Sequence, residues 1–147
     1  MFVVDTNILV YAINQDSPHS DACFARLQEW SHQVSAWFLT WGICYEFLRV
    51  VTHARVLSSP WTVAQGWGFL EELLHSPGLS ILGPTERHAE VLAQVLKEVP
   101  TIGGNRMYDA QTAVLMREHG VRRIYTRDTD FHRFPFLEPV DPIVRQV

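Results

Sequence analysis

The sequence predicts an α/β protein in which helices cover both faces of a mainly parallel sheet. Short apolar runs at residues 2–4, 34–39, 79–82 and 122–126 are typical of buried strands, and segments with a helical period near 3.6 separate them. Strands that alternate with helices indicate a three-layer α/β/α sandwich. The chain has 147 residues, of which 47% are apolar, and this suits a single domain over residues 1–147 without a linker or a repeat.

The chain opens with a strand, an acid and a helix. The strand at residues 2–4 ends at Asp5, and either Asp5 or Thr6 is expected to cap the helix that follows. The pair Ser17-Pro18 predicts a second helix with proline at its first position, running to about residue 31. These two helices lead to the strand at residues 34–39.

The middle of the chain repeats this alternation. Thr40 is expected to cap a helix, and Ser59-Pro60 predicts the start of another helix, which ends at Pro77-Gly78. The strand at residues 79–82 follows.

The last third adds two helices and the remaining strand. Thr85 is expected to cap a helix that Pro100 closes. The next helix contains Asp109 and ends at Gly120, which we expect in the left-handed conformation. After the strand at residues 122–126 comes a proline-rich tail, which we expect to fold over the sheet edge with Val140 as a last strand residue.

Composition excludes several classes of protein. With 16 acidic and 12 basic side chains the net charge is −4, so nucleic acid is not held by bulk electrostatic attraction. The apolar runs are shorter than the roughly 20 residues of a membrane span. We therefore expect a cytoplasmic protein without membrane contact. The two cysteines, Cys23 and Cys44, lack the CxxC spacing of a metal or redox site and are expected to be reduced core residues.

Four carboxylates stand where a parallel sheet binds its ligands, at the carboxyl ends of the strands. Asp5 follows the first strand, Asp128 follows the last, and Glu46 and Asp109 lie in early turns of helices that can begin at the same edge. Carboxylates crowded in this way repel one another, and a divalent cation normally compensates them. Oxygen ligands without cysteine or histidine favour Mg²⁺ or Mn²⁺ over zinc.

The sequence around these acids resembles the PIN-domain nucleases, and in its length the chain is similar to a VapC-type toxin of a bacterial toxin-antitoxin pair. The resemblance rests on Asp-Thr-Asn at 5–7, Tyr-Asp-Ala at 108–110 and Thr-Arg-Asp-Thr-Asp-Phe at 126–131. By position, the four acids of the family match Asp5, Glu46, Asp109 and Asp128, and its supporting polar positions match Asn7, Thr126 and Asp130. Trp41 and Gly42, ahead of Glu46, depart from the family pattern and leave the orientation of Glu46 open.

The resemblance implies a PIN-like fold and a metal-dependent endoribonuclease that hydrolyses RNA phosphodiester bonds. It implies Asp5 and Asp109 as direct ligands of Mg²⁺ or Mn²⁺, with Glu46 and Asp128 completing the site directly or through water. Three arginines near the C-terminal acid motifs are candidates for binding RNA phosphates: Arg106, Arg127 and Arg133.

The same resemblance implies partner proteins. A cognate antitoxin would inhibit the enzyme, and helices near the N-terminus and the middle would form the antitoxin groove and a homodimer contact. Trp61 and Trp67, which we expect on one helix, are candidates to anchor such an interface.

Other readings of the acids stay open. A catalytically silent PIN-like binding module and an RNA-processing PIN nuclease outside a toxin-antitoxin pair share the same motifs. An aspartate-nucleophile phosphatase usually needs a second aspartate where this chain has Asn7. A phosphoacceptor receiver domain needs a lysine at a strand end, whereas the single Lys97 lies in a helical pattern.

Overall fold

The computed structural model describes residues 1–144 and contains a five-stranded sheet in which every strand pair is parallel. The strands and helices follow one another in this order: β1 (Phe2–Val4), α1 (Thr6–Ile13), α2 (Ser20–His32), β2 (Trp37–Leu39), α3 (Trp41–Val51), α4 (Val63–Leu74), β3 (Leu79–Ile81), α5 (His88–Glu98), α6 (Arg106–Glu118), β4 (Arg123–Tyr125), the 3₁₀ helix η1 (Thr129–Arg133) and β5 (Glu138–Val140).

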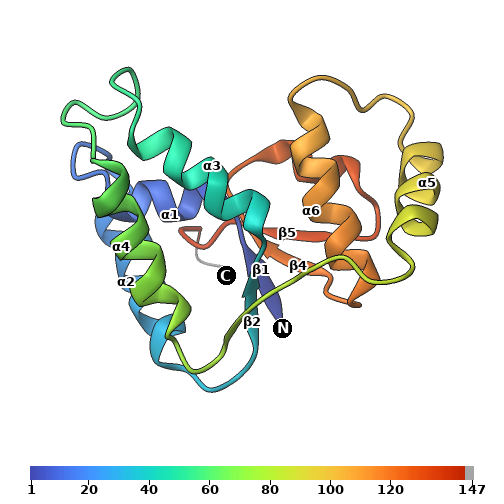
Figure 1. Ribbon diagram of the computed structural model, residues 1–147, viewed down its shortest axis with the longest axis horizontal. Coiled ribbons are helices and arrows are strands. Elements are labelled where there is room, and N and C mark those ends of the chain that lie inside the picture. Colours follow the sequence, from blue (N-terminus) through green and yellow to red (C-terminus); the bar gives the residue numbers. More distant parts are fainter. Residues whose placement is uncertain (145–147) are drawn as a thin grey trace.

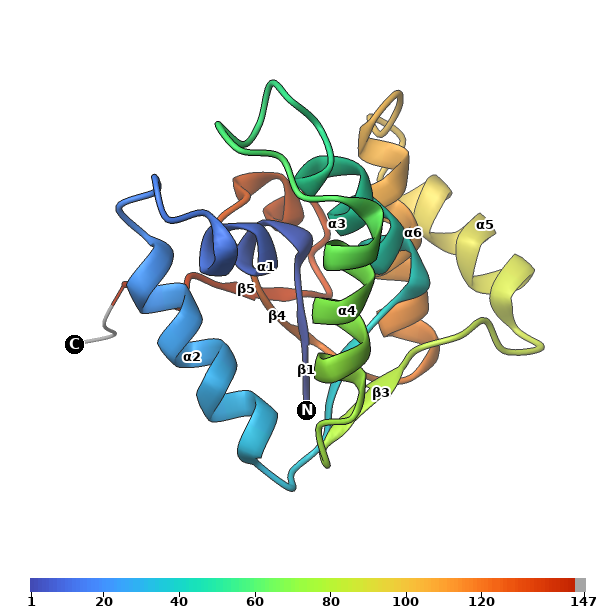
Figure 2. The same ribbon diagram turned by 60° about the vertical axis from the view of Figure 1, so that its left-hand side comes forward.

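The strand order β3-β2-β1-β4-β5 places the first strand at the centre of the sheet. Helices α1 to α4 lie on one side of the sheet and α5 and α6 on the other (Figure 1), and a turned view keeps α2 and α5 on opposite sides (Figure 2). The predicted three-layer sandwich with a parallel sheet is therefore confirmed. The direction of strand addition reverses between β1 and β4, which is where open α/β sheets bind ligands.

One hydrophobic core spans both helical layers. Val3 and Ile124 are fully buried at the centre of the sheet, Phe47 is buried under α3, and Met116 is buried under α6. Both cysteines are buried and unpaired, as predicted. None of the helices in residues 1–144 has the length and apolar character of a membrane span. Residues 145–147 of the predicted domain lie outside the described part of the chain.

Two predicted helix starts are wrong, because each Ser-Pro pair lies in the connection before its helix. Helix α2 begins at Ser20, because the Ser17 hydroxyl accepts a hydrogen bond from the backbone of His19 (3.1 Å) and stabilises a local turn. Helix α4 begins at Val63 behind a capping box formed by Thr62 and Gln65.

Trp61 consequently precedes α4 instead of lying on it. Its backbone N–H donates to the Val51 carbonyl (2.8 Å), and its ring packs edge-on against Phe47 and Phe69. This tryptophan therefore joins α3 to α4. Trp67 remains 41% exposed and is still available for an interface.

The predicted cap of the fifth helix is also wrong. Helix α5 begins at His88, and the Thr85 hydroxyl donates to the Glu118 carboxylate (2.7 Å). At the next junction Gly120 has φ of +70°, which confirms the left-handed residue predicted after α6. Val140 lies in β5, as predicted, and β5 pairs with β4 at the sheet edge.

Strand β1 occupies the predicted residues 2–4, whereas β2, β3 and β4 are shorter than the apolar runs that predicted them. For example, the run that begins at Val34 forms a strand only over Trp37–Leu39, and Val34 itself is 85% exposed.

Candidate active site

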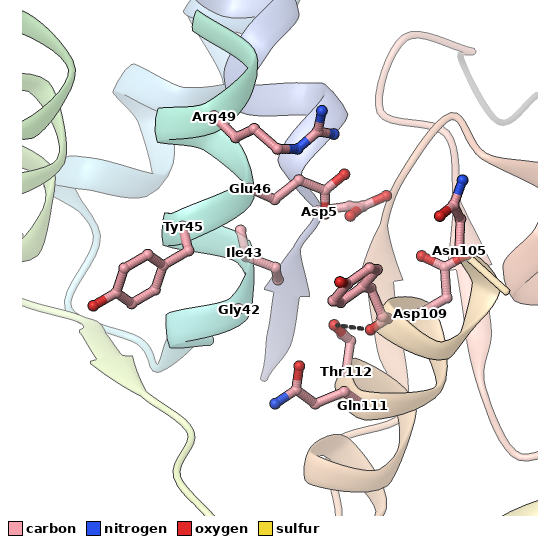
Figure 3. Close-up of a pocket in the computed structure, with 11 residues that line it drawn as sticks. Asp5, Gly42, Ile43, Tyr45, Glu46, Arg49, Asn105, Asp109, Gln111 and Thr112 are labelled. Atoms are coloured by element: carbon pink, nitrogen blue, oxygen red, sulfur yellow. Dashed lines mark hydrogen bonds between the residues drawn. The ribbon is translucent and has the colours of Figure 1, made fainter. Parts of the chain in front are cut away.

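A cleft opens at the carboxyl edge of the sheet, between helices α3 and α6 (Figure 3). Its volume is about 560 Å³. Asp5, at the tip of β1, lies between the two helices (Figure 3). The cleft is lined by Asp5, Gly42, Ile43, Tyr45, Glu46, Arg49, Asn105, Tyr108, Asp109, Gln111 and Thr112.

Asp5 serves both as a helix cap and as the central acid of the cleft. One carboxylate oxygen accepts from the backbone N–H of Thr6 (2.8 Å), which caps α1. The other accepts from the hydroxyl of Thr126 (2.7 Å), the residue that follows β4. Asp5 is only 8% exposed. The sheet therefore fixes this carboxylate from both of its central strands.

Thr126 connects the two ends of the chain through its hydroxyl group. Besides donating to Asp5, this hydroxyl accepts from the side-chain amide of Asn7 (3.2 Å) and from the backbone N–H of Asp128 (2.9 Å). The side-chain carbonyl of Asn7 in turn accepts from the backbone N–H of Arg127 (3.4 Å). The expected supporting residues Asn7 and Thr126 thus lie directly behind the acids.

Glu46 lies on the side of α3 that faces Asp5 (Figure 3). The Thr6 hydroxyl donates to Glu46 at 3.3 Å, so α1 helps to hold this carboxylate. Gly42, one turn earlier, allows close approach of α3 to α6. A Cβ atom there would lie 3.1 Å from the side-chain oxygen of Gln111.

Asp109 and two acids of the last loop form the second half of the site. Oxygen atoms of Asp109, Asp128 and Asp130 lie within 4.8 Å of one another, an arrangement able to hold a metal ion. Asp128 also caps η1 by accepting from the backbone N–H of Asp130 (2.9 Å). Asp130 is therefore a candidate ligand as well as a supporting residue.

Two of these carboxyl groups have pKa values raised far above the usual range. Burial raises the pKa of Asp5 to about 7, with Glu46 and Asp128 adding to the rise against the hydrogen bonds from Thr126 and Thr6. Burial and the surrounding acids, Asp5 first among them, together raise the pKa of Asp109 to about 7. Such groups favour a bound proton or a bound cation.

The donor set fits a hard divalent cation. All candidate ligands are carboxylate oxygens, supported by threonine hydroxyls, as Mg²⁺ and Mn²⁺ prefer. A positive ion would also compensate the repulsion that raises the pKa of Asp109. Asp5, Glu46, Asp109 and Asp128, the four acids selected from the sequence, thus lie together at one edge of the sheet.

The three arginines selected from the sequence all contact carboxylates. Arg106 and Arg133 each lie 3.6 Å from Asp130. Arg127 lies 3.3 Å from Asp141 in the C-terminal tail and is only 25% exposed. Arg127 therefore anchors the tail and is poorly placed for a phosphate.

Sequence reasoning missed the cation that lines the cleft. Arg49 stands three residues after Glu46, which on a helix places both on neighbouring positions of the same face. It also missed Tyr108, although this residue directly precedes Asp109. That adjacency is the signal in the sequence that could have found Tyr108.

Comparison with known proteins gives one family model that matches this chain. The model is described as the PIN domain and matches residues 2–137. Ribonuclease VapC33 of Mycobacterium tuberculosis is 30% identical over 143 residues, covering 97% of this chain and 99% of the relative. Ribonuclease VapC48 of the same species is 28% identical over 138 residues, covering 94% of each chain.

Solved structures share the fold at lower identity. VapBC2 from Rickettsia felis, bound to a promoter DNA fragment, aligns with a TM-score of 0.66 and 20% identity over 95% of this chain and 96% of that one. Mycobacterium tuberculosis VapC20, a toxin that cleaves the sarcin-ricin loop, aligns with a TM-score of 0.65 and 17% identity over 99% of this chain and 100% of that one.

Proposed function

The chain belongs to the PIN-domain family, and from this premise we propose that it is an endoribonuclease that hydrolyses RNA phosphodiester bonds with Mg²⁺ or Mn²⁺. The observation that carries the proposal is the acid cluster, in which Asp5 and Asp109 have pKa values raised to about 7 beside further carboxylates. The relatives that share nearly the whole chain are named ribonucleases.

In this mechanism Asp5 and Asp109 would hold the cation, with Glu46 and Asp128 completing the site. Such a cation would supply charge neutralisation for the phosphodiester and a lowered pKa for water. The chain itself supplies orientation: Thr126 fixes one oxygen of Asp5, and Thr6 holds Glu46.

The nearby thiol is a poor nucleophile. Cys44 is 1% exposed, and burial raises its pKa to about 11. Hydrolysis by water therefore fits the site better than a covalent intermediate on sulfur.

The test is cleavage of single-stranded or loop RNA by the purified chain. Cleavage should require Mg²⁺ or Mn²⁺, stop in EDTA and return when the metal is restored. Undiminished cleavage in EDTA would contradict the metal mechanism.

The biological role that we propose is that of a toxin inhibited by a cognate antitoxin. A groove of about 400 Å³ between α2 and α4 suits a partner helix, because Phe24, Leu27, Phe69 and Leu73 give it an apolar lining. This groove lies at the C-terminal ends of α2 and α4, just before β2 and β3, so a separate basic segment of the partner would be needed to reach the carboxylates and offset their charge. Titration of Mg²⁺ against the complex should therefore weaken inhibition.

The same experiments separate the alternatives. Partner binding without RNA cleavage would indicate a silent binding module, and cleavage with no inhibitory partner would indicate an RNA-processing nuclease.

The proposal further includes a homodimer and a cytoplasmic location. Sedimentation of the purified chain tests the former, and fractionation of cells tests the latter.

A further inference from the structure

The walls of the cleft carry side chains that the acid chemistry does not use. Beside the carboxylates, α3 contributes Arg49, and α6 contributes Tyr108 and Gln111. Aromatic rings, guanidinium groups and amides are the side chains with which proteins bind unpaired nucleotides. The cleft therefore offers more than a metal site.

Tyr108 differs from the tyrosines that build the core. Tyr125 packs edge-on against Phe2 with ring centroids 4.8 Å apart, and Tyr11 packs against His19 at 5.4 Å. Tyr108 is 67% exposed, and within residues 1–144 its ring stacks on no other aromatic ring. An uncovered ring next to Asp109 is available to stack on a ligand.

Arg49 differs from the arginines selected from the sequence. Arg106, Arg127 and Arg133 lie within 4.0 Å of carboxylates, whereas Arg49 forms no such pair in the part of the chain that the structure describes. Its guanidinium group lies near Glu46 at the cleft (Figure 3). Arg49 is therefore free to bind a phosphate close to the acids.

The size and shape of the cleft favour a single unpaired nucleotide. Its volume of about 560 Å³ lies within the range of sites that bind small ligands. In a duplex both faces of an internal base are covered by its neighbours, so only an unpaired, unstacked base presents a face to Tyr108.

We propose that this cleft is a subsite for one unpaired nucleotide of the RNA substrate, with its base stacked on Tyr108 and its phosphate bound by Arg49. The inference rests on the proposed ribonuclease function and adds the two side chains that bind one nucleotide of the substrate.

Tyr45 provides a matched control for Tyr108. Both are exposed tyrosines, at 72% and 67%, and each directly precedes a site acid. The ring of Tyr45 extends from α3 away from Asp5 (Figure 3). The proposal therefore assigns base stacking to Tyr108 and not to Tyr45.

Binding of a fluorescent single-stranded RNA, measured by anisotropy in EDTA, separates binding from cleavage. Tyr108→Leu should weaken binding about 5- to 150-fold, the range found when one stacked base is lost. Tyr108→Phe should bind like the wild type, because it keeps the ring. Tyr45→Leu should also bind like the wild type.

The decisive readout is coupling to the base. We expect one RNA in a series of RNAs with single abasic positions to behave differently from the others. The wild type should bind this RNA more weakly than intact RNA, whereas Tyr108→Leu should bind the two RNAs equally well. A loss that is the same for every abasic RNA, no loss at all, or an equal base-dependent loss in Tyr45→Leu overturns the assignment.

Arg49 is tested by the salt dependence of the same binding. Arg49→Gln should reduce the slope of log K against log salt concentration by about one, because one phosphate contact is lost. Arg122→Gln is the control, since Arg122 is exposed and precedes β4 at the opposite edge of the sheet. Equal slopes for the wild type and Arg49→Gln overturn the phosphate contact.

Cleavage in Mg²⁺, assayed separately, distinguishes failure of the subsite from failure of the function. Cleavage by the wild type with unaltered RNA binding in all variants contradicts the subsite alone. RNA binding with the expected variant effects but without cleavage contradicts the ribonuclease function alone. If the wild type does not bind RNA, the subsite is overturned. It is also overturned if Tyr108→Leu loses binding to a partner protein but keeps its binding to RNA.

Discussion

Asp5 and Glu118 are both withdrawn from solvent, yet their surroundings move their pKa values in opposite directions. Burial raises the pKa of Asp5 to about 7. Neighbouring carboxylates add to this rise, and two hydrogen bonds offset it only in part. The side chain of Glu118 has no solvent-exposed area. Burial raises its pKa too, but hydrogen bonds from His88 and Thr85 outweigh this and hold the pKa below its usual value.

Asp5 is buried and Glu118 half-buried as a residue, but the opposite directions of the two pKa shifts come from their partners. Glu118 accepts from the backbone and hydroxyl of Thr85 at 2.8 and 2.7 Å and lies 2.7 Å from His88 Nδ1. It therefore ties the start of α5 to α6 without any added ion. Asp5 belongs to a group of like charges in which, among residues 1–144, arginines pair with Asp130 alone. A satisfied carboxylate stabilises the fold, and an uncompensated one indicates a binding site.

The largest expected difference between the two regions is in catalysis. Asp5→Asn or Asp109→Asn should lower the rate of RNA cleavage roughly 100- to 1000-fold, the scale for loss of a preorganised charge-stabilising group. Asparagine also caps helices, so Asp5→Asn keeps the start of α1. Glu118→Gln should retain most of the activity, because this side chain lies outside the cleft.

Rates measured on one RNA at one Mg²⁺ concentration check this prediction. Near-wild-type cleavage by Asp109→Asn would place that acid outside the active site.

The next difference concerns stability, where Glu118→Gln should be the more damaging change and Asp109→Asn the less damaging one. Glu118→Gln should lower the free energy of unfolding by about 1–2 kcal/mol, because a hydrogen-bonded buried charge is replaced by a neutral group. Urea unfolding in EDTA measures this loss as a lower midpoint with an unchanged slope. An unchanged midpoint would show that Thr85 and His88 find equivalent partners.

The same acid-to-amide change at Asp109 should have the opposite effect. Asp109→Asn removes one charge from the repelling cluster, so it should melt above the wild type in EDTA. At ten times its dissociation constant Mg²⁺ should stabilise the wild type by about 1.4 kcal/mol, which is a few degrees. The variant should gain less.

Thermal melts of both proteins, with EDTA and with Mg²⁺, check this result. If Asp109→Asn is less stable in EDTA and still gains the full increment, Asp109 is a structural residue of the first turn of α6.

The smallest expected effect is the pH dependence of stability, because solvent screens the half-buried Asp109. The folded pKa of Asp5 and Asp109, about 7, exceeds the ordinary 3.8, so the metal-free fold binds more protons than the unfolded chain between these values. Their contribution is greatest at acidic pH and is lost as pH rises toward 7. The pKa of Glu118 is lowered, so this residue stabilises the fold at pH values above its usual pKa of 4.5, and the stabilisation is lost as the pH falls.

Melting temperatures in EDTA between pH 5 and 8 should therefore fall more for the wild type than for Asp109→Asn. Saturating Mg²⁺ should reduce the difference. Parallel curves in EDTA would show that Asp109 does not take up a proton in this range.

The alternation of strands and helices was predictable because it depends on local apolar patterns. The location of the acids at the carboxyl edge of the sheet was predictable for a related reason, since Asp5 and Asp128 follow strands of a parallel sheet. Helix starts were less predictable. Ser17-Pro18 and Ser59-Pro60 have the composition of helix caps, but tertiary contacts and competing turns move the starts to Ser20 and Val63.

The roles of the arginines were not predictable, because their partners are distant in sequence. Nothing local to Arg127 indicates that Asp141 lies 3.3 Å from it. Likewise, the sequence alone does not reveal that α3 turns Arg49 toward the cleft and leaves Tyr108 opposite on α6.

The neighbour relation between β1 and β4 has a consequence for synthesis of the protein. Asp5 is translated 121 residues before Thr126, whose hydroxyl fixes its carboxylate. A nascent chain that has not passed residue 122 carries three of the four acids and still lacks β4, the strand that pairs with β1. The acid site therefore cannot assemble during synthesis until the chain has been made through β4 and the loop that follows it.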